Sequence, residues 1–154
     1  MRIVAFEPRH AQAWRLLNEA WITKHFAIEA KDREVLDDPA GKIIAKGGHI
    51  FMAEQDDGTA VGCVALAAMA DGGFEVAKMT VGEAARGTGL GRRLMQVCID
   101  RAAELGAHRL YLETNSGLAP ALGLYRAMGF TDLDPAMRPR TDYARCDVWM
   151  ERAL

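Results

Sequence analysis

A glycine-rich turn, RGTGLG at residues 86–91, constrains the fold more than any other stretch, because it separates a predicted strand from a predicted long helix. The first turn of a helix leaves backbone N–H groups unpaired and carries partial positive charge, so an anion bound there gains several hydrogen bonds. Gly87, Gly89 and Gly91 lack a Cβ, which permits positive φ angles and lets a ligand approach the backbone closely. We therefore predict that this turn binds a phosphate or pyrophosphate.

The residues around the turn support the same prediction. Arg86, Arg92 and Arg93 supply positive charge, and Thr88 supplies a hydroxyl group that can donate a hydrogen bond or cap the helix. The alternative is a turn that merely joins a strand to a helix, since short glycine patterns recur by chance. The arginines and the helical spacing of the apolar residues that follow favour the anion site, those residues being Leu90, Leu94, Val97, Cys98 and Leu105.

Two known phosphate-binding patterns differ from this turn. A nucleotide-triphosphate loop has Lys and then Ser or Thr after its last glycine, whereas Gly91 is followed by two arginines. A dinucleotide-binding turn places its third glycine one position later and lies directly after its strand, but here EAAR intervenes at 83–86. Glu113 does occupy the place of the acidic ribose ligand. An NAD(P)-binding oxidoreductase therefore stands only as an alternative hypothesis.

Hydrophobic periodicity and turn signals predict seven strands and four helices. Asp-Gly turns join three consecutive strands into a meander. The last strand alternates apolar Ala144, Cys146, Val148 and Met150 with polar or exposed neighbours. The element order indicates a mixed α/β or α+β structure. The expected strands are 2–6, 49–55, 60–69, 74–81, 108–114, a short one near 130 and 144–151; the expected helices are one from Pro8, a short one around 35–36, and 88–105 and 118–128.

Length and composition indicate a soluble globular protein. The 154 residues fit one domain, 1–154, and the formal net charge of -2 gives no reason to expect nucleic acid or membrane binding. Cys63, Cys98 and Cys146 lie far apart in apolar settings, so we interpret them as reduced core residues. The N-terminal apolar run is too short for a signal sequence or a membrane span. We expect a cytoplasmic protein.

The motifs resemble those of the GCN5-related N-acetyltransferase (GNAT) family. The family signature is Arg or Gln, two residues, Gly, one residue, and Gly or Ala, and this chain has it at 86–91. The resemblance extends to VAKMTV at 76–81, YLETNS at 111–116 and LYRAMGF at 124–130. It implies an α/β (α+β) fold with a mixed, mostly antiparallel sheet of six to seven strands, flanked by about four helices. It also implies acetyl-CoA as the co-substrate and no metal.

The resemblance further implies where acetyl-CoA binds. The sheet would splay apart between strands 74–81 and 108–114, and the pantetheine arm would occupy the gap. The backbone of Met79, Thr80 and Val81 would face that arm, with Met79 and Val81 pairing with it as an added strand would. Asn115 would contact the arm and Tyr125 the sulfur. The pyrophosphate would lie on the turn and first helical residues, which are Arg86, Gly87, Thr88, Gly89, Leu90, Gly91 and Arg92.

The reaction implied is direct transfer of the acetyl group from the thioester to a primary amine. Such an amine has a pKa of about 10, so a general base must accept its proton at neutral pH. We favour Glu75 as that base, and Tyr125 as the proton donor or hydrogen-bond donor to the leaving sulfur. Glu29, Asp32, His49 and Glu113 are the other candidate bases, and His10, His25 and His108 are interpreted as surface residues.

The acceptor is less constrained than the donor. The acidic segment EAKDREVLDD, residues 29–38, would lie over the acceptor mouth by family analogy and attract a cationic amine, or it is a solvated helix face. We expect a small-molecule or peptide amine as the acceptor. A homodimer is one option, since closed symmetric pairs are the commonest oligomers. A non-catalytic acetyl-CoA sensor would have the same turn and stands as a second alternative.

Overall fold

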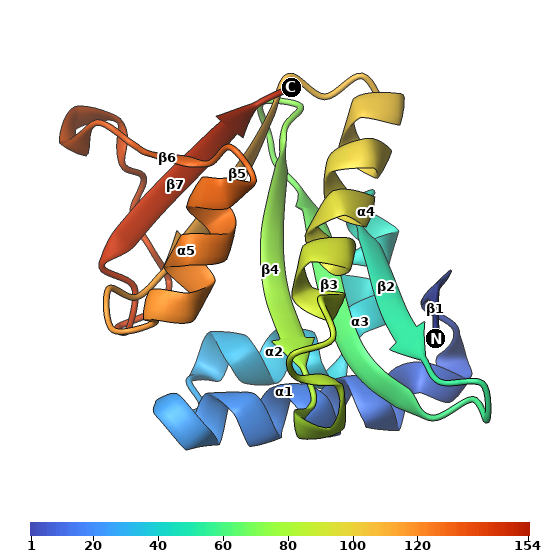
Figure 1. Ribbon diagram of the computed structural model, residues 1–154. Helices are drawn as coiled ribbons and strands as arrows, with labels where there is room; N and C mark the ends of the chain where they lie inside the picture. Colours follow the sequence, from blue (N-terminus) through green and yellow to red (C-terminus); the bar gives the residue numbers. More distant parts are fainter.

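The protein forms one seven-stranded sheet in a computed structural model that describes all residues, 1–154. The strand order is β1-β2-β3-β4-β5-β7-β6 (Figure 1). Only the β4–β5 pair is parallel, as expected of a mixed and mostly antiparallel sheet. The strands are β1 Arg2–Ala5, β2 His49–Glu54, β3 Ala60–Ala68, β4 Phe74–Val81, β5 Arg109–Thr114, β6 Thr131–Asp132 and β7 Val148–Ala153.

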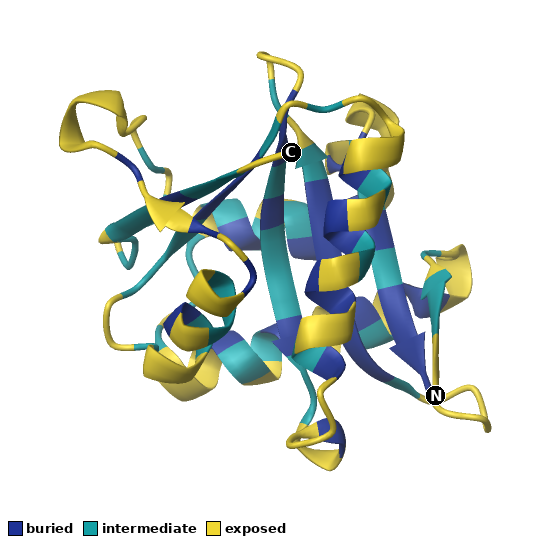
Figure 2. Ribbon diagram, turned by 45° about the horizontal axis from the view of Figure 1, so that its top comes forward, coloured by how far each residue is buried: buried dark blue, intermediate teal, exposed yellow.

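Helices cover both faces of the sheet (Figure 1). Helices α4 (Leu90–Glu104) and α5 (Ala119–Ala127) pack on one face, and α1 (Ala11–His25), α2 (Ala30–Asp37) and α3 (Pro39–Lys42) pack on the other. Each side of the sheet has its own apolar core because β-strand side chains alternate between the faces. Figure 2 shows the corresponding pattern on α4, whose inward stripe is buried and whose outer side is exposed. None of the helices combines the length and apolar character that a membrane crossing requires.

Strands β4 and β5 separate soon after they begin. Their pairing extends over two residue pairs, Phe74 with Leu110 and Glu75 with Tyr111, and the strands then diverge toward their C-terminal ends (Figure 1). Beyond Glu75, the edge of β4 that faces β5 has no partner strand. The splayed sheet predicted between strands 74–81 and 108–114 is therefore present.

A β-bulge distorts β4 next to this opening. The register with β3 shifts between Cys63 and Ala65, and Lys78 adopts a positive φ of 54°, which is uncommon for a residue with a Cβ. Because one extra residue is accommodated in β4, the side chains on either side of the bulge are re-aimed. Lys78 thereby reaches a buried carboxylate of α2, which is described below.

Three sequence interpretations need correction. The last strand begins at Val148 rather than 144, because side-chain hydrogen bonds hold residues 144–147 against the segment after β5 and the start of α2. Cys146 is half-buried rather than part of the core, although Cys63 and Cys98 are buried as expected. His10 is not a surface residue: it is 2% exposed, accepts a hydrogen bond from the Glu7 N–H through Nδ1 and pairs through Nε2 with Glu54.

Candidate active site

A cavity of about 560 Å³ occupies the opening between β4 and β5. It contacts elements from both faces of the sheet, since α5 and the glycine turn lie on one side and α1 on the other. Two of its lining residues are exposed, Arg86 in the glycine turn and His25 at the end of α1. The predicted site residues that line it are Glu75, Met79, Thr80, Val81, Arg86, Gly91, Asn115 and Tyr125.

The glycine turn presents a row of free backbone donors. Gly87 and Gly89 have φ angles of 74° and 79°, and Gly89 is the N-cap residue of α4. None of the six backbone N–H groups from 87 to 92 has a hydrogen-bond acceptor within the protein. A pyrophosphate is the kind of group that satisfies several such donors at once. The residues present at this end of the cavity therefore fit the phosphates of acetyl-CoA.

Thr88 stabilises this turn with its side chain. Its hydroxyl donates a hydrogen bond to the Ala85 carbonyl, closing the segment that leads into the turn. The side chain is thus committed within the protein, while the backbone N–H of Thr88 stays free. A Cβ built on Gly87 or Gly89 would meet no atom within 4 Å, so the protein itself requires glycine there only for the backbone conformation.

The unpaired edge of β4 supplies the wall nearest the predicted pantetheine arm. Met79 and Val81 line the cavity and pack against the core of the α4–α5 face. Thr80 is buried, and its hydroxyl donates to Asn18 Oδ1 on α1 at 3.0 Å. That hydrogen bond fixes the strand to α1, so the edge is held in place without a partner strand.

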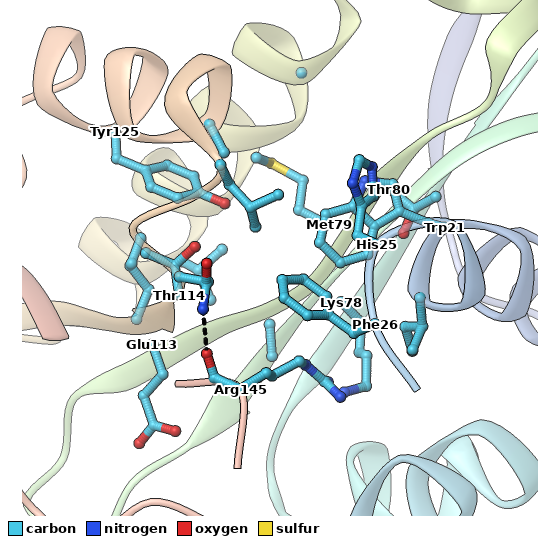
Figure 3. Close-up of a pocket in the computed structure, with 18 of the residues that line it drawn as sticks. Trp21, His25, Phe26, Lys78, Met79, Thr80, Glu113, Thr114, Tyr125 and Arg145 are labelled. Atoms are coloured by element: carbon cyan, nitrogen blue, oxygen red, sulfur yellow. Dashed lines mark hydrogen bonds between the residues drawn. The ribbon is translucent and has the colours of Figure 1, made fainter. Parts of the chain in front are cut away.

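Tyr125 projects from α5 into the cavity with an unpaired hydroxyl. Its ring packs against the core, 6.1 Å between centroids from Phe130, and its hydroxyl has no hydrogen-bond partner in the protein (Figure 3). Burial raises the pKa of Tyr125 to about 12. The phenol is therefore neutral at physiological pH and can donate a proton or a hydrogen bond.

Asn115 lines the same cavity, but its side chain already has partners. Nδ2 donates to the Arg145 carbonyl at 2.7 Å, the bond drawn in Figure 3, and Oδ1 accepts from the Gly117 N–H at 2.8 Å. These bonds join the end of β5 to the segment before β7. The predicted contact of Asn115 with the pantetheine arm stays a prediction.

Two carboxylates lie on the α1-facing side of the splayed strands. Glu75 on β4 forms no hydrogen bond or ion pair, whereas Glu113 on β5 accepts hydrogen bonds from the hydroxyls of Tyr111 and Thr141, both at 2.6 Å. Burial, and then the negative charge of Glu113, raise the pKa of Glu75 to about 7. A carboxylate with such a pKa is half-deprotonated at neutral pH, which suits a general base.

The other candidate bases lie outside the cavity lining. Asp32 is fully buried in an ion-pair network, so neither interpretation of the acidic segment, as a solvated face or as an attractant at the mouth, applies to it. Glu29 bonds to the Ala144 N–H and pairs with Arg145. His49 is half-buried at the start of β2, away from the cavity.

The Asp32 network also fixes the cavity wall. Arg145 makes two hydrogen bonds to the Asp32 carboxylate, both 2.7 Å, and Lys78 Nζ lies 2.8 Å from Asp32 Oδ1 and 3.1 Å from the Tyr143 hydroxyl. Burial alone would raise the pKa of Asp32, but the hydrogen bonds from Arg145 and Lys78 outweigh it and hold that pKa well below its usual range. The bulge of β4, α2 and the segment before β7 are thereby joined.

Several lining residues were not identified from the sequence. Lys78 carried one signal, since it is the lone charge in the apolar run VAKMTV. The others have no local signal because they come from distant segments, and they include Trp21, His25, Phe26, Tyr143, Arg145 and Cys146. No group of three or more His, Cys, Asp or Glu side chains is arranged to hold a metal ion.

Comparison with known proteins identifies the family of this chain. The model of the acetyltransferase (GNAT) family matches residues 11–130, which include the glycine turn, both splayed strands and most of the cavity lining. The chain belongs to the GNAT family. It is thus an N-acetyltransferase whose acyl donor, as the family implies, is acetyl-CoA. The predicted family, fold and enzyme class are confirmed.

Individual relatives of this GNAT protein agree. An IAA acetyltransferase of Azospirillum brasilense is 41% identical over 93 residues, 60% of this chain and 61% of that protein's length. The N-acetyltransferase YjgM of Escherichia coli (strain K12) is 31% identical over 116 residues, 73% of this chain and 69% of its own. The crystal structure of a GNAT-family acetyltransferase from Staphylococcus aureus superimposes with a TM-score of 0.90 over 99% of this chain and 98% of that one, at 17% identity.

Proposed function

We propose that the protein transfers the acetyl group of acetyl-CoA directly to a primary amine of a small molecule or peptide, with Glu75 as general base and Tyr125 as proton donor to the sulfur. The observation that carries this proposal is one cavity that is lined by an unpaired neutral phenol and an unpaired carboxylate with a pKa of about 7, and that reaches Arg86 and Gly91 of the turn with the free backbone donors. A non-catalytic sensor would need the donors but not the other two groups.

Acetyl-CoA, when bound, supplies an activated acetyl carbonyl. The backbone of 87–92 would hold its phosphates together with Arg86, and Met79 and Val81 would align its arm along β4. One proton of the ammonium group passes to Glu75, and the free amine attacks. As the new N–C bond forms and the C–S bond breaks, Tyr125 donates its proton to the departing thiolate and regains a proton from the acylated nitrogen. Overall, ammonium and acetyl-CoA give the amide, the CoA thiol and one proton, which leaves Glu75 for the solvent.

A thermal melt with acetyl-CoA, CoA and NAD in parallel tests the donor. A ligand at 100 times its Kd stabilises the folded state by about 2.7 kcal/mol, so acetyl-CoA and CoA should each raise the melting temperature while NAD should not. Release of free CoA in the presence of an amine then tests transfer. Stabilisation by acetyl-CoA without CoA release from any amine would instead support the sensor.

Four further expectations accompany this proposal. We infer that residues 1–154 act as one domain, because strands from both ends of the chain complete a single sheet. A reducing cytoplasm is consistent with three free cysteines. The acceptor enters from the α1 side, and neither nucleic acid nor a membrane is required for the reaction. Whether two copies pair into a homodimer can be read from the mass in solution.

A further inference from the structure

The cations of the acceptor side are all neutralised within the protein. Lys78 and Arg145 are the lining cations on the α1-facing side, and both pair with Asp32, while Arg145 also reaches Glu29 at 3.3 Å. The two positive and two negative charges of this network balance. Arg86, the remaining lining arginine, lies in the glycine turn before α4, on the other face of the sheet. An acceptor carboxylate would therefore find no free cation on this side.

The negative charges of the same side are not neutralised. Glu75 has no partner, and Glu113 is bonded only to the hydroxyls of Tyr111 and Thr141. Besides burial, the negative charge of Glu113 contributes to the raised pKa of Glu75 and outweighs the opposing influence of Lys78. A positive charge brought to this side is attracted, and a second negative charge is repelled.

An aromatic cluster forms the wall supplied by α1 and the residue that follows it. The rings of Trp21, His25 and Phe26 all line the cavity, with centroid separations of 5.1 Å for Trp21–His25 and 6.2 Å for both pairs that include Phe26 (Figure 3). Figure 3 shows this cluster across the cavity from Tyr125. Tyr143 offers less surface, because Lys78 and Arg145 already lie over its ring at 4.6 and 4.5 Å, whereas Arg145 lies farther from the Phe26 ring, at 5.9 Å.

Together these features define an acceptor chemistry. We propose that the acceptor is a cationic arylalkylamine without a carboxylate: its ammonium group lies near Glu75 and Glu113, and its ring packs against Trp21 and Phe26. This inference rests on the proposed function, since it names the substrate class of that reaction. An α-amino acid with the same side chain would bring an unpaired carboxylate into a half-buried, negatively charged site, which is costly.

Matched pairs of compounds test the absence of a carboxylate. Phenethylamine and phenylalanine, and tyramine and tyrosine, differ only in that group, and release of CoA gives kcat/KM for each. We expect the amine of each pair to exceed its amino acid by at least about 100-fold, on the order of 3 kcal/mol at 1.4 kcal/mol per factor of ten. Phenylalaninamide, which lacks the negative charge but keeps the substituent, should recover most of the difference.

The aromatic requirement has its own test. Phenethylamine should exceed ethylamine, and Trp21→Ala should raise KM for phenethylamine by about tenfold while changing that for ethylamine little. Leu16→Ala is the matched control, because Leu16 is 51% exposed on the same helix and does not line the cavity. Equal values for the two amines in the wild-type protein would overturn the assignment of the ring.

The possible outcomes distinguish a failure of the acceptor assignment from a failure of the proposed acetyl transfer. Acetylation of phenylalanine or tyrosine as fast as of the matching amines would overturn the carboxylate-free acceptor and leave the transferase in place. Binding of acetyl-CoA without acetylation of any amine or amino acid would overturn the transfer itself. Glu113→Gln gives a further readout, because removing this charge should narrow the ratio between phenethylamine and phenylalanine.

Discussion

Glu75 and Tyr125 line the same cavity with opposite proton demands. Burial raises the pKa of both, which leaves Tyr125 a donor and brings Glu75 into the range where a carboxyl group can lose and regain a proton at neutral pH. In water at neutral pH a tyrosine side chain is neutral and a glutamate is charged. The same upward shift of the pKa therefore leaves Tyr125 a proton donor and makes Glu75 a stronger base. Each role leads to a different kinetic expectation.

For Glu75, the expectation concerns pH. If it is the base, kcat/KM of the wild-type protein should rise tenfold per pH unit below about 7 and level off above it, because only the deprotonated form accepts a proton. Glu75→Gln should lower the plateau by about 100-fold or more and remove this limb. Persistence of the limb in the variant would assign the base to another group, Glu113 first.

The same substitution has a stability signature with a defined sign. Because the pKa of Glu75 is raised on folding from 4.5 to about 7, the folded state binds the extra proton, and stability falls as pH rises between those values. Glu75→Gln removes this loss, at most about 3 kcal/mol by the size of the shift. Its melting temperature relative to wild type should therefore be higher at pH 8 than at pH 5, as thermal unfolding at both values would show.

For Tyr125, the expectation concerns the split between kcat and KM. A donor to the leaving sulfur acts chiefly in the transition state, so Tyr125→Phe should reduce kcat by about 10- to 100-fold and leave the acetyl-CoA Kd unchanged. The ring still fills its place against Phe130, which keeps the fold. An unchanged kcat, with chemistry shown to limit turnover, would make Tyr125 a packing residue only.

Among the elements, the turn from β4 into α4 depends on backbone conformation more than on side chains. Gly89 has φ +79° and no protein atom near a built Cβ, and Gly58 in the β2–β3 hairpin has φ +88° with the same open surroundings. The two glycines thus face the same internal constraint, but only Gly89 lies beside the free N–H groups. Comparing substitutions at these two glycines therefore distinguishes the effect of backbone strain from the effect on ligand binding.

Valine at either position tests the difference. Gly89→Val and Gly58→Val should each destabilise the fold by about 1–3 kcal/mol, because a β-branched residue at positive φ is strained. Only Gly89→Val should also abolish detectable acetyl-CoA binding in calorimetry. Equal affinity in the two variants would exclude this turn as the pyrophosphate site.

The elements are also where sequence inference worked best. Strand β4 has the predicted bounds, and α4 and the glycine turn follow from local signals that occur within a few residues of each other. The residues missed are those whose partners are remote, such as Asp32 with Arg145, 113 positions apart, and His10 with Glu54, 44 apart. The local sequence around a charged residue does not show which distant residue it will pair with in the fold. The ion pairs of the acceptor side could therefore not be predicted from the sequence.

At the scale of the whole molecule, the Asp32 network connects three segments around the cavity. Asp32 comes from α2, Lys78 from the bulge of β4 and Arg145 from the segment before β7. Burying these charged side chains costs desolvation free energy, but each of them has an oppositely charged partner in the network. The walls of the acceptor side are consequently fixed to one another before any acceptor arrives.

Arg145→Ala should therefore destabilise the protein by about 3 kcal/mol, because Asp32 would keep only Lys78 as a charged partner. Arg140→Ala is a suitable control, since Arg140 is exposed and forms no ion pair. Urea unfolding of both variants gives the comparison, and equal midpoints would show that the network adds nothing to stability. The Arg145 effect should shrink as pH falls, because a protonated Asp32 no longer needs the guanidinium.

The cavity is lined by helices from opposite faces of the sheet, α5 on one and α1 on the other. We therefore expect donor and acceptor to be bound at the same time, so that neither must leave before the other arrives. Cys146, the one thiol in the lining, is not poised to carry an acyl group, since burial and the charge of Glu113 raise its pKa. Double-reciprocal plots at several fixed amine concentrations should accordingly give intersecting rather than parallel lines, and CoA should inhibit competitively against acetyl-CoA but not against the amine.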